Sequence, residues 1–167
     1  MPDERTEFPT QLPNTGDRPG SRFDEPSASP GSVLWQVATM WQRSLRSALE
    51  AVGLTHAQFV LLASAWWLGE RSDAPVTQAH IADHARTDAV MTSEVLRTLE
   101  RKQLVQRLPH PGDARARRIV LTDAGRTVAA RAITLVEAAD AAFFGVPGTE
   151  LQLLARLLPR AGASTGA

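Results

Sequence analysis

Basic side chains gather in one stretch of a chain that is neutral overall. The 167 residues hold 18 basic and 18 acidic side chains. Between residues 97 and 131 there are nine basic residues and three acidic ones, a local net charge of +6. An arginine-rich stretch is typical of a surface that binds a polyanion, because the planar guanidinium forms paired hydrogen bonds with phosphate or guanine. The alternative is a charged face that is only solvated.

Metal and catalytic chemistry find little support in the chain. His80 and His84 are four residues apart, so both could face one metal ion from a single helix. The chain has no cysteine, and no acidic residue follows His80 directly as in a metalloprotease helix. We therefore interpret the pair as polar residues on a surface helix and expect no metal site and no cofactor. We find no Ser-His-Asp order and no phosphate-binding loop, so we expect no enzyme.

Location and domain organisation follow from composition. No run approaches the roughly 18 apolar residues that span a membrane, and Met1–Thr10 carries three acids without an apolar segment. We expect a cytoplasmic protein. Residues 1–30 hold six of the eleven prolines and a net charge of −3, which predicts a disordered or loosely docked arm. The predicted folded domain is 31–163, and 162–167 is a short tail.

The elements that position the basic stretch begin with four predicted helices. Apolar residues at steps of three and four predict a helix over about 33–52, ended by Gly53. Thr55 and Gln58 have the spacing of a capping box, which begins a buried helix running to about residue 68. Thr77 can cap a short helix over 78–85, and a longer helix over about 89–103 follows after three residues. Two helices joined so closely indicate a helix-turn-helix.

A β-hairpin and two more helices complete the predicted order. Segments 104–108 and 118–122 look extended, and the turn-forming residues Pro109–Asp113 between them predict a hairpin longer than the two-residue kind. A hairpin after such a helix is the wing of a winged helix. Thr122 caps a long helix with apolar positions at 128, 132, 135, 139 and 143, and a last helix begins at Thr149. The predicted fold is mainly α with a small β-hairpin.

The wing region resembles the signature of the MarR (multiple antibiotic resistance regulator) family. Its pattern, Asp-x-Arg, a short strand and then Leu-Thr-x-x-Gly, matches the stretch Asp113–Gly125. The stretches Leu54–Phe59 and Leu99–Val105 resemble other recurring stretches of the family in the same order, and the resemblance covers about Val33–Arg160. Two positions depart from the pattern: Gln103 replaces a usual glycine, and Glu94 stands where many relatives carry a basic or neutral residue. We expect Gln103 to be tolerated in a left-handed helix cap.

The resemblance implies a homodimer that binds double-stranded DNA. Its winged helix-turn-helix would span about 54–122, and its dimerisation helices about 33–52 and 123–161. A partner chain would cover the apolar stripes of those outer helices. The twofold dimer would place its recognition helices in successive major grooves, roughly 34 Å apart, on a near-palindromic operator.

The expected DNA contacts lie on the helix-turn-helix and the wing. Val90 and Met91 would contact thymine methyl groups, Glu94 would accept from a cytosine amine, and the wing arginines would contact phosphate or the minor groove. The full set of predicted contact residues is Thr77, Gln78, Thr87, Val90, Met91, Ser93, Glu94, Arg97, Arg115 and Arg117. For Thr77 and Gln78, simple helix capping is an equal alternative to DNA contact.

The resemblance also implies a small aromatic or amphipathic effector bound between the dimer region and the DNA-binding lobe. Candidate residues are Trp35, Trp41, Arg46, His56, Phe59 and Trp66, although core packing is the competing role for each tryptophan. We therefore predict a ligand-responsive transcription regulator, most often a repressor in such families. A winged-helix adaptor that binds only protein is the alternative.

Overall fold

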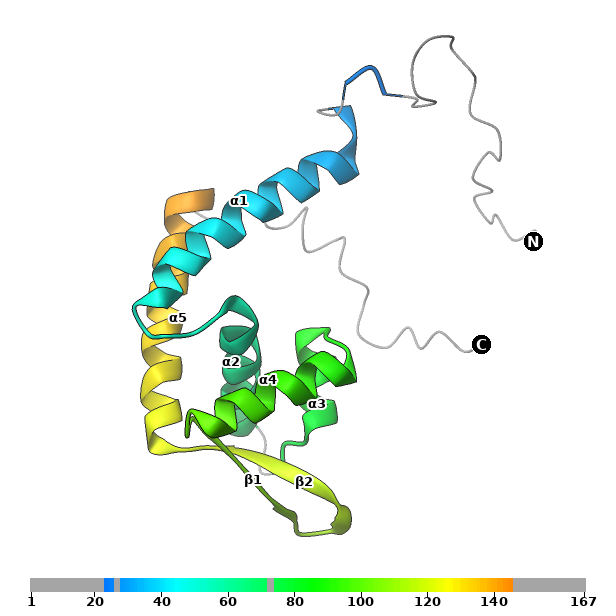
Figure 1. Ribbon diagram of the computed structural model, residues 1–167, viewed down its shortest axis with the longest axis vertical. Helices are drawn as coiled ribbons and strands as arrows, with labels where there is room; N and C mark the ends of the chain where they lie inside the picture. Colours follow the sequence, from blue (N-terminus) through cyan, green and yellow to red (C-terminus); the bar gives the residue numbers. More distant parts are fainter. Residues whose placement is uncertain (1–22, 26–27, 72–73, 146–167) are drawn as a thin grey trace, which may run out of the picture. The chain divides into compact units, whose positions relative to one another are not determined.

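The computed structural model describes residues 23–25, 28–71 and 74–145 (Figure 1). The chain divides into two compact units, one ending at Met40 and the other beginning at Trp41. The predicted last helix from Thr149, the tail and most of the predicted arm lie outside the described residues. The described elements, in order, are α1 (Pro30–Glu50), α2 (His56–Arg71), α3 (Gln78–Ala85), α4 (Ala89–Arg101), β1 (Val105–His110), β2 (Asp113–Leu121) and α5 (Asp123–Phe144). This confirms the predicted mainly α fold with one hairpin.

Two helices end in the same hydrogen-bonded turn on different residues. After α1, Gly53 has φ of 65°, and the N–H groups of Gly53 and Leu54 donate to the carbonyls of Glu50 and Leu49. After α4, Gln103 has φ of 58°, and the N–H groups of Gln103 and Leu104 donate to the carbonyls of Glu100 and Leu99. This is the Schellman turn, which favours glycine because a side chain is strained at positive φ. The expectation that Gln103 adopts a left-handed cap is confirmed.

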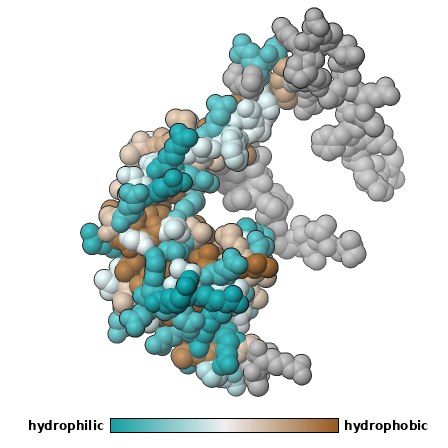
Figure 2. All heavy atoms as spheres, in the orientation of Figure 1, coloured by the Kyte–Doolittle hydropathy of each residue, from teal (hydrophilic) through white to brown (hydrophobic). Residues whose placement is uncertain are grey.

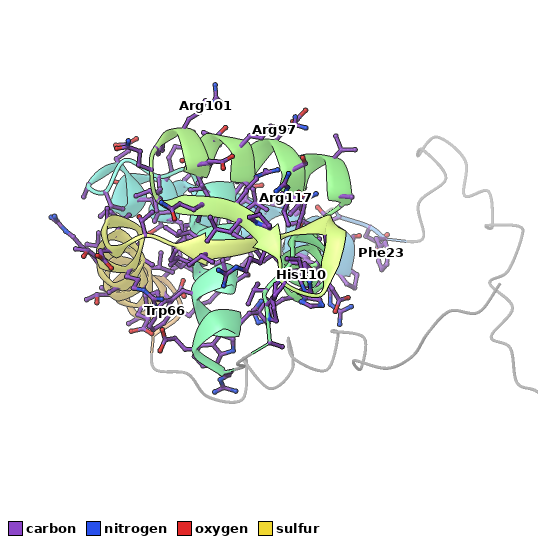
Figure 3. All side chains as sticks on the ribbon, turned by 90° about the horizontal axis from the view of Figure 1, so that it is seen from below. Phe23, Trp66, Arg97, Arg101, His110 and Arg117 are labelled. Carbon is purple, nitrogen blue, oxygen red and sulfur yellow. The ribbon has the colours of Figure 1, made fainter. Side chains whose placement is uncertain are left out.

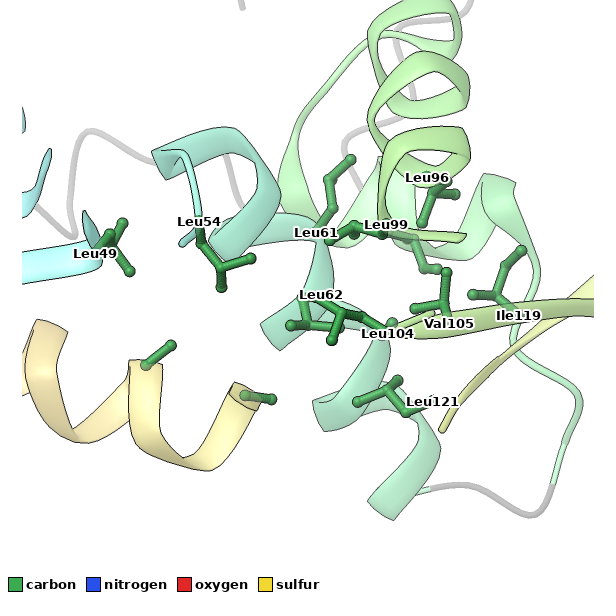
Figure 4. Close-up of a cluster of buried hydrophobic side chains, with 14 of the residues drawn as sticks. Leu49, Leu54, Leu61, Leu62, Leu96, Leu99, Leu104, Val105, Ile119 and Leu121 are labelled. Carbon is green, nitrogen blue, oxygen red and sulfur yellow. The ribbon is translucent and has the colours of Figure 1, made fainter. Parts of the chain in front are cut away.

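The core of the second unit forms around α2 (Figure 4). Leu61 and Leu62 of α2 are fully buried, and α2 packs against α3, α4, α5 and β2. The remaining fully or nearly fully buried apolar residues include Leu45, Leu49, Ile81, Leu96, Leu99, Val105, Ala129 and Ala132. The confirmed caps Thr55 and Thr122 begin α2 and α5 against this core.

The first turn of α5 lies directly against the strand that leaves α4. The hydroxyl of Thr122 accepts from the N–H of Gly125 at 2.9 Å and donates to the carbonyl of Gln103 at 2.7 Å. A Cβ atom at Gly125 would overlap the backbone carbonyl of Leu104. The buried face of α5 is Gly125, Ala129, Ala132 and Val136, so it is rotated from the predicted stripe, whose Val128 and Leu135 are half-buried.

The hairpin is tighter than predicted. Its strands reach His110 and Asp113 and leave only Pro111 and Gly112 as the turn, so the predicted loop over 109–113 is wrong. Pro109 is tolerated because the edge of β1 that faces away from β2 pairs with no other strand among the described residues. The pairing register shifts between Pro109 and His110, which absorbs the extra residues of β2. No helix in the described ranges is long and apolar enough to cross a membrane.

Candidate nucleic-acid interface

The turn between α3 and α4 is fixed by caps on both sides. The hydroxyl of Thr77 accepts from the N–H of His80 at 3.3 Å, and Nδ1 of His80 accepts from the N–H of Thr77 at 3.4 Å. Histidine therefore takes the place of the usual Glu or Gln in a capping box. Arg86, at φ of 55°, ends α3. The carboxylate of Asp88 caps α4 by accepting from the N–H of Met91 at 2.8 Å, a role that sequence reasoning missed.

Two predicted contact residues serve the turn itself. Thr92 donates its hydroxyl proton to the carbonyl of Asp88 at 2.7 Å, so the 2.8 Å bond between the Thr87 and Thr92 hydroxyls has Thr87 as donor. The amide of Gln78 donates to the carbonyl of Ala89 at 3.3 Å. The Gln78 bond ties α3 to the first residue of α4, and the Thr87 bond ties the turn to the first turn of α4. Contact of Thr87 and Gln78 with DNA stays a prediction.

The outer face of α4 exposes two of the three predicted base-reading residues, Val90 and Glu94. Val90 is 69% exposed, an unusual value for a large apolar residue. Glu94 and Arg97 are also exposed, whereas Met91 and Ser93 are half-buried. Figure 3 shows Arg97 and Arg101 extending away from α4, and hydrophilic residues gather over α4 in Figure 2. This face offers one apolar group and several charged ones to a partner.

The wing is held against α4 by an arginine that sequence reasoning counted only as charge. Nη2 of Arg107 in β1 donates to the carbonyl of Ser93 at 3.1 Å, and its Nε lies 3.4 Å from a carboxylate oxygen of Glu100. The bond to Ser93 anchors the base of the hairpin to the middle of α4. Its only sequence signal was an arginine on a half-buried strand.

The two predicted wing arginines lie in β2. Arg117 is exposed, and it forms no ion pair among the residues that the structure describes. Arg115 belongs to the strand by its backbone, and its side chain, like that of Asp113, lies outside the described part. Because β1 contacts α4, the base of the wing and the recognition helix form one continuous surface.

The predicted effector residues fall into separate places. Trp41 and His56 meet edge to face with ring centroids 5.3 Å apart, and the indole N–H of Trp41 donates to Asp140 at 2.7 Å. Burial lowers the pKa of the His56 imidazole, and the nearby Asp140 carboxylate opposes part of this shift. Phe59 is half-buried against the core and Arg46 is exposed.

Trp66 lines a cavity that none of the other five predicted effector residues lines. The cavity has a volume of about 180 Å³ and lies between the end of α2, residues 74–76, β2 and the start of α5. Arg118 and Arg126 also line it. Arg126 pairs with Glu70 at 2.8 Å, whereas the buried Nε of Arg118 has no hydrogen-bond partner within the described ranges. Trp35 is 73% exposed on the first unit.

His80 and His84 have different hydrogen-bond partners. His80 completes the cap of α3, and Nδ1 of His84 lies 3.0 Å from the hydroxyl of Ser64. In the part of the chain that the structure describes, no three potential ligands come together.

Comparisons with known proteins agree with this geometry. The model of the MarR family matches residues 54–116. An uncharacterized HTH-type transcriptional regulator of Bacillus subtilis, YdcH, is 41% identical over 124 residues, which are 74% of this chain and 84% of that protein. An HTH-type transcriptional repressor of Mycobacterium tuberculosis is 33% identical over 66% of this chain and 76% of its own length.

Two solved structures share the fold. CouR from Rhodococcus jostii, bound to p-coumaroyl-CoA, is 25% identical with a TM-score of 0.69, covering 80% of this chain and 91% of that one. A mutant MarR of E. coli in complex with operator DNA is 25% identical with a TM-score of 0.68, covering 77% and 93%. With a helix-turn-helix, an adjoining wing and a 41% identical relative, this chain belongs to the MarR family of transcriptional regulators.

Proposed function

We propose that this regulator is a homodimeric repressor that binds a near-palindromic operator. The observation that carries the proposal is the surface of α4 and the wing. There Val90, Arg97 and Arg117 are exposed, and Arg97 and Arg117 form no ion pair with another described residue. Of the residues predicted to contact DNA, Val90, Met91, Ser93, Glu94 and Arg97 lie on α4, and Arg115 and Arg117 belong to β2 by their backbone. The E. coli MarR of similar fold is bound to operator DNA, and the M. tuberculosis relative is named a repressor.

Val90 and Glu94 are suited to base readout and Arg117 to the backbone. Side chains near the start of a recognition helix reach base edges in the major groove, where an apolar group can contact a thymine methyl and a carboxylate can accept from cytosine. An arginine on the wing can contact phosphate or a narrow minor groove. This division predicts a sequence preference set by α4 and a salt dependence set by arginines.

The exposed apolar side chains of α1 support dimerisation. Its first half exposes Val33, Leu34, Trp35, Val37 and Met40 by 38–73%. Contiguous exposed apolar side chains mark a protein interface. A second copy of this chain is the partner that a twofold operator requires.

A small amphipathic or aromatic effector would release the operator. The cavity beside Trp66 could hold a single aromatic ring, since a cavity of about 150 Å³ accepts benzene. Arg118 offers a positive charge at its wall, which favours an acidic group. Release requires that the effector bind the non-binding conformation more tightly than the DNA-bound one.

Fluorescence anisotropy of the full-length protein with the duplex upstream of its own gene tests the proposal. A scrambled duplex and two salt concentrations provide the controls. We expect the native duplex to bind at least about 1000-fold more tightly than the scrambled one. Equal, salt-sensitive binding to both would contradict sequence recognition, and no binding to either at low salt would favour the adaptor function.

A further inference from the structure

The chain has one lysine, and its ammonium joins three helix ends. Lys102 caps the C-terminus of α4. Its Nζ donates to the carbonyl of Gly53 at 2.6 Å and to the side-chain oxygen of Gln58 at 2.9 Å. Hydrogen bonds from an ionised donor are shorter and stronger than neutral ones.

One acceptor lies in the connection between α1 and α2, and the other lies in the first turn of α2. Gly53 follows α1 in its left-handed turn. Oε1 of Gln58 also accepts from the N–H of Thr55 at 3.3 Å, so it is part of the box that begins α2. Gln58 is only 9% exposed, and its position is therefore fixed by the core. Lys102 thus ties the end of the recognition helix to Gly53, which follows α1, and to Gln58, which begins α2. The helix α1 is the one proposed to form the dimer.

Lys102 stands at the wrong end of α4 to read bases. Val90 and Lys102 are twelve residues apart, which is roughly 18 Å along a helix. A tilt of about 10° at the Lys102 end would move the base-reading end by roughly 3 Å. Each recognition helix must enter its own groove at a fixed separation from the other, so the dimer is sensitive to such a tilt.

We propose that Lys102 is a positioning residue for operator binding, which sets the direction of α4 relative to the α1–α2 connection without touching DNA. The inference rests on the proposed dimeric operator binding. Leu96 and Leu99 are fully buried and hold α4 in the core without the help of Lys102. Loss of the ammonium therefore leaves the fold in place and changes only the direction of α4.

The test compares Lys102→Met with Arg101→Met in the full-length protein. Both variants remove one exposed positive charge from the end of α4, but among the described residues Arg101 hydrogen-bonds only to Thr98 of its own helix, at 2.9 Å. Anisotropy is measured with the operator, with an isolated half-site, and with operators whose half-sites are moved by one or two base pairs. Salt dependence and the unfolding temperature are measured for each variant.

We expect Lys102→Met to weaken operator binding by roughly tenfold and to broaden the spacing preference. Half-site affinity and the salt slope should match those of Arg101→Met. Equal losses in both variants on operator and half-site, with a shallower salt slope, would overturn the inference and make Lys102 a phosphate contact. A lower unfolding temperature with unchanged operator affinity would overturn it in favour of a purely structural role.

Chemical acetylation provides a second variant made on folded protein. Because Lys102 is the one side-chain amine, an acetyl ester should weaken operator binding by the wild type but not by Lys102→Met, in which only a terminal amine can react. Equal loss in both proteins would overturn the inference. If the wild type does not distinguish the operator from the scrambled duplex, the proposed function itself is wrong. This outcome is distinct from failure of the Lys102 inference, in which the wild type still prefers the operator.

Discussion

Two exposed surfaces of this chain differ in the chemistry that they offer a partner. The first half of α1 exposes five large apolar side chains, with Trp35 the most exposed at 73%. The outer face of α4 exposes one large apolar residue, Val90, among charged residues that include Glu94 and Arg97. An apolar surface associates by removing area from water, whereas a basic surface associates with DNA by releasing counterions. The two associations should therefore differ in their response to salt and to substitution.

The largest effect is expected from charge placed on the apolar surface. Leu34→Arg combined with Trp35→Arg should raise the dimer dissociation constant by at least about 100-fold, because both side chains would lose burial against the partner. Sedimentation equilibrium measures this. Gln36→Arg, on the same helix, is the control and should leave the dimer intact. A double variant that stays dimeric at the wild-type concentration would show that α1 is not the interface.

Gly125 and Gln103 are two positions that favour glycine, and substitutions there test the local backbone geometry that supports the DNA-binding surface. Gly125→Ala should lower the free energy of unfolding by roughly 3 kcal/mol, because the new methyl overlaps the carbonyl of Leu104. Gln103→Gly should raise it by up to about 1 kcal/mol, because Gln103 holds φ of 58°. Urea denaturation measures both. Changes of the same sign would contradict the two local geometries.

Arg117→Ala should weaken DNA binding by roughly tenfold at low salt and reduce the salt slope by about one. The loss should be similar on operator and scrambled duplexes, because a backbone contact carries no sequence information. Arg43→Ala, an exposed arginine of α1, is the control and should change neither value. A loss confined to the operator would make Arg117 a base-reading residue.

Val90→Ala should cost a few-fold in operator affinity through one thymine methyl, which is worth on the order of 1 kcal/mol. Replacing each operator thymine by uracil locates the contact, since uracil lacks the methyl group. One such replacement should weaken the wild type and leave Val90→Ala unaffected. If no thymine shows this coupling, Val90 does not read a methyl group.

The smallest expected effect concerns His56. Its pKa is lowered by burial, so the folded state favours the neutral ring. The stabilisation is complete above the ordinary value near 6.5 and is lost as the pH falls below it, because the unfolded chain takes up the proton first. Denaturation at pH 7.5 and 5.5 should show a smaller decrease for His56→Gln than for the wild type. An equal decrease would show that His56 does not contribute to the loss of stability at low pH.

Local chemistry made much of the fold predictable from the sequence. Capping pairs such as Thr55 and Gln58 act over three residues, and Gly53 ends α1 through its own φ. The left-handed cap at Gln103 was predictable because Gln103 stands where the family pattern usually has glycine, and an amide residue tolerates that conformation. The wing was recognised because its Asp-x-Arg and Leu-Thr-x-x-Gly patterns lie together in the chain.

Long-range contacts were not predictable. The bond from Arg107 to Ser93 and the bonds from Lys102 to Gly53 and Gln58 join residues 14 to 49 positions apart. No periodicity reports such pairs. Pro109 led to the wrong prediction of a loop, although it lies in β1. A proline can lie in a strand when its side of the strand has no pairing neighbour, which the sequence does not show.

The contrast between the two surfaces is tested most directly by measuring both associations over one salt series. Anisotropy gives the operator affinity, and sedimentation gives the dimer dissociation constant, from about 50 to 200 mM salt. We predict that operator affinity falls linearly with the logarithm of salt concentration while the dimer constant changes little. A dimer constant that weakens as steeply as DNA binding, or an operator affinity independent of salt, would contradict the assignment of charge to one surface and apolar burial to the other.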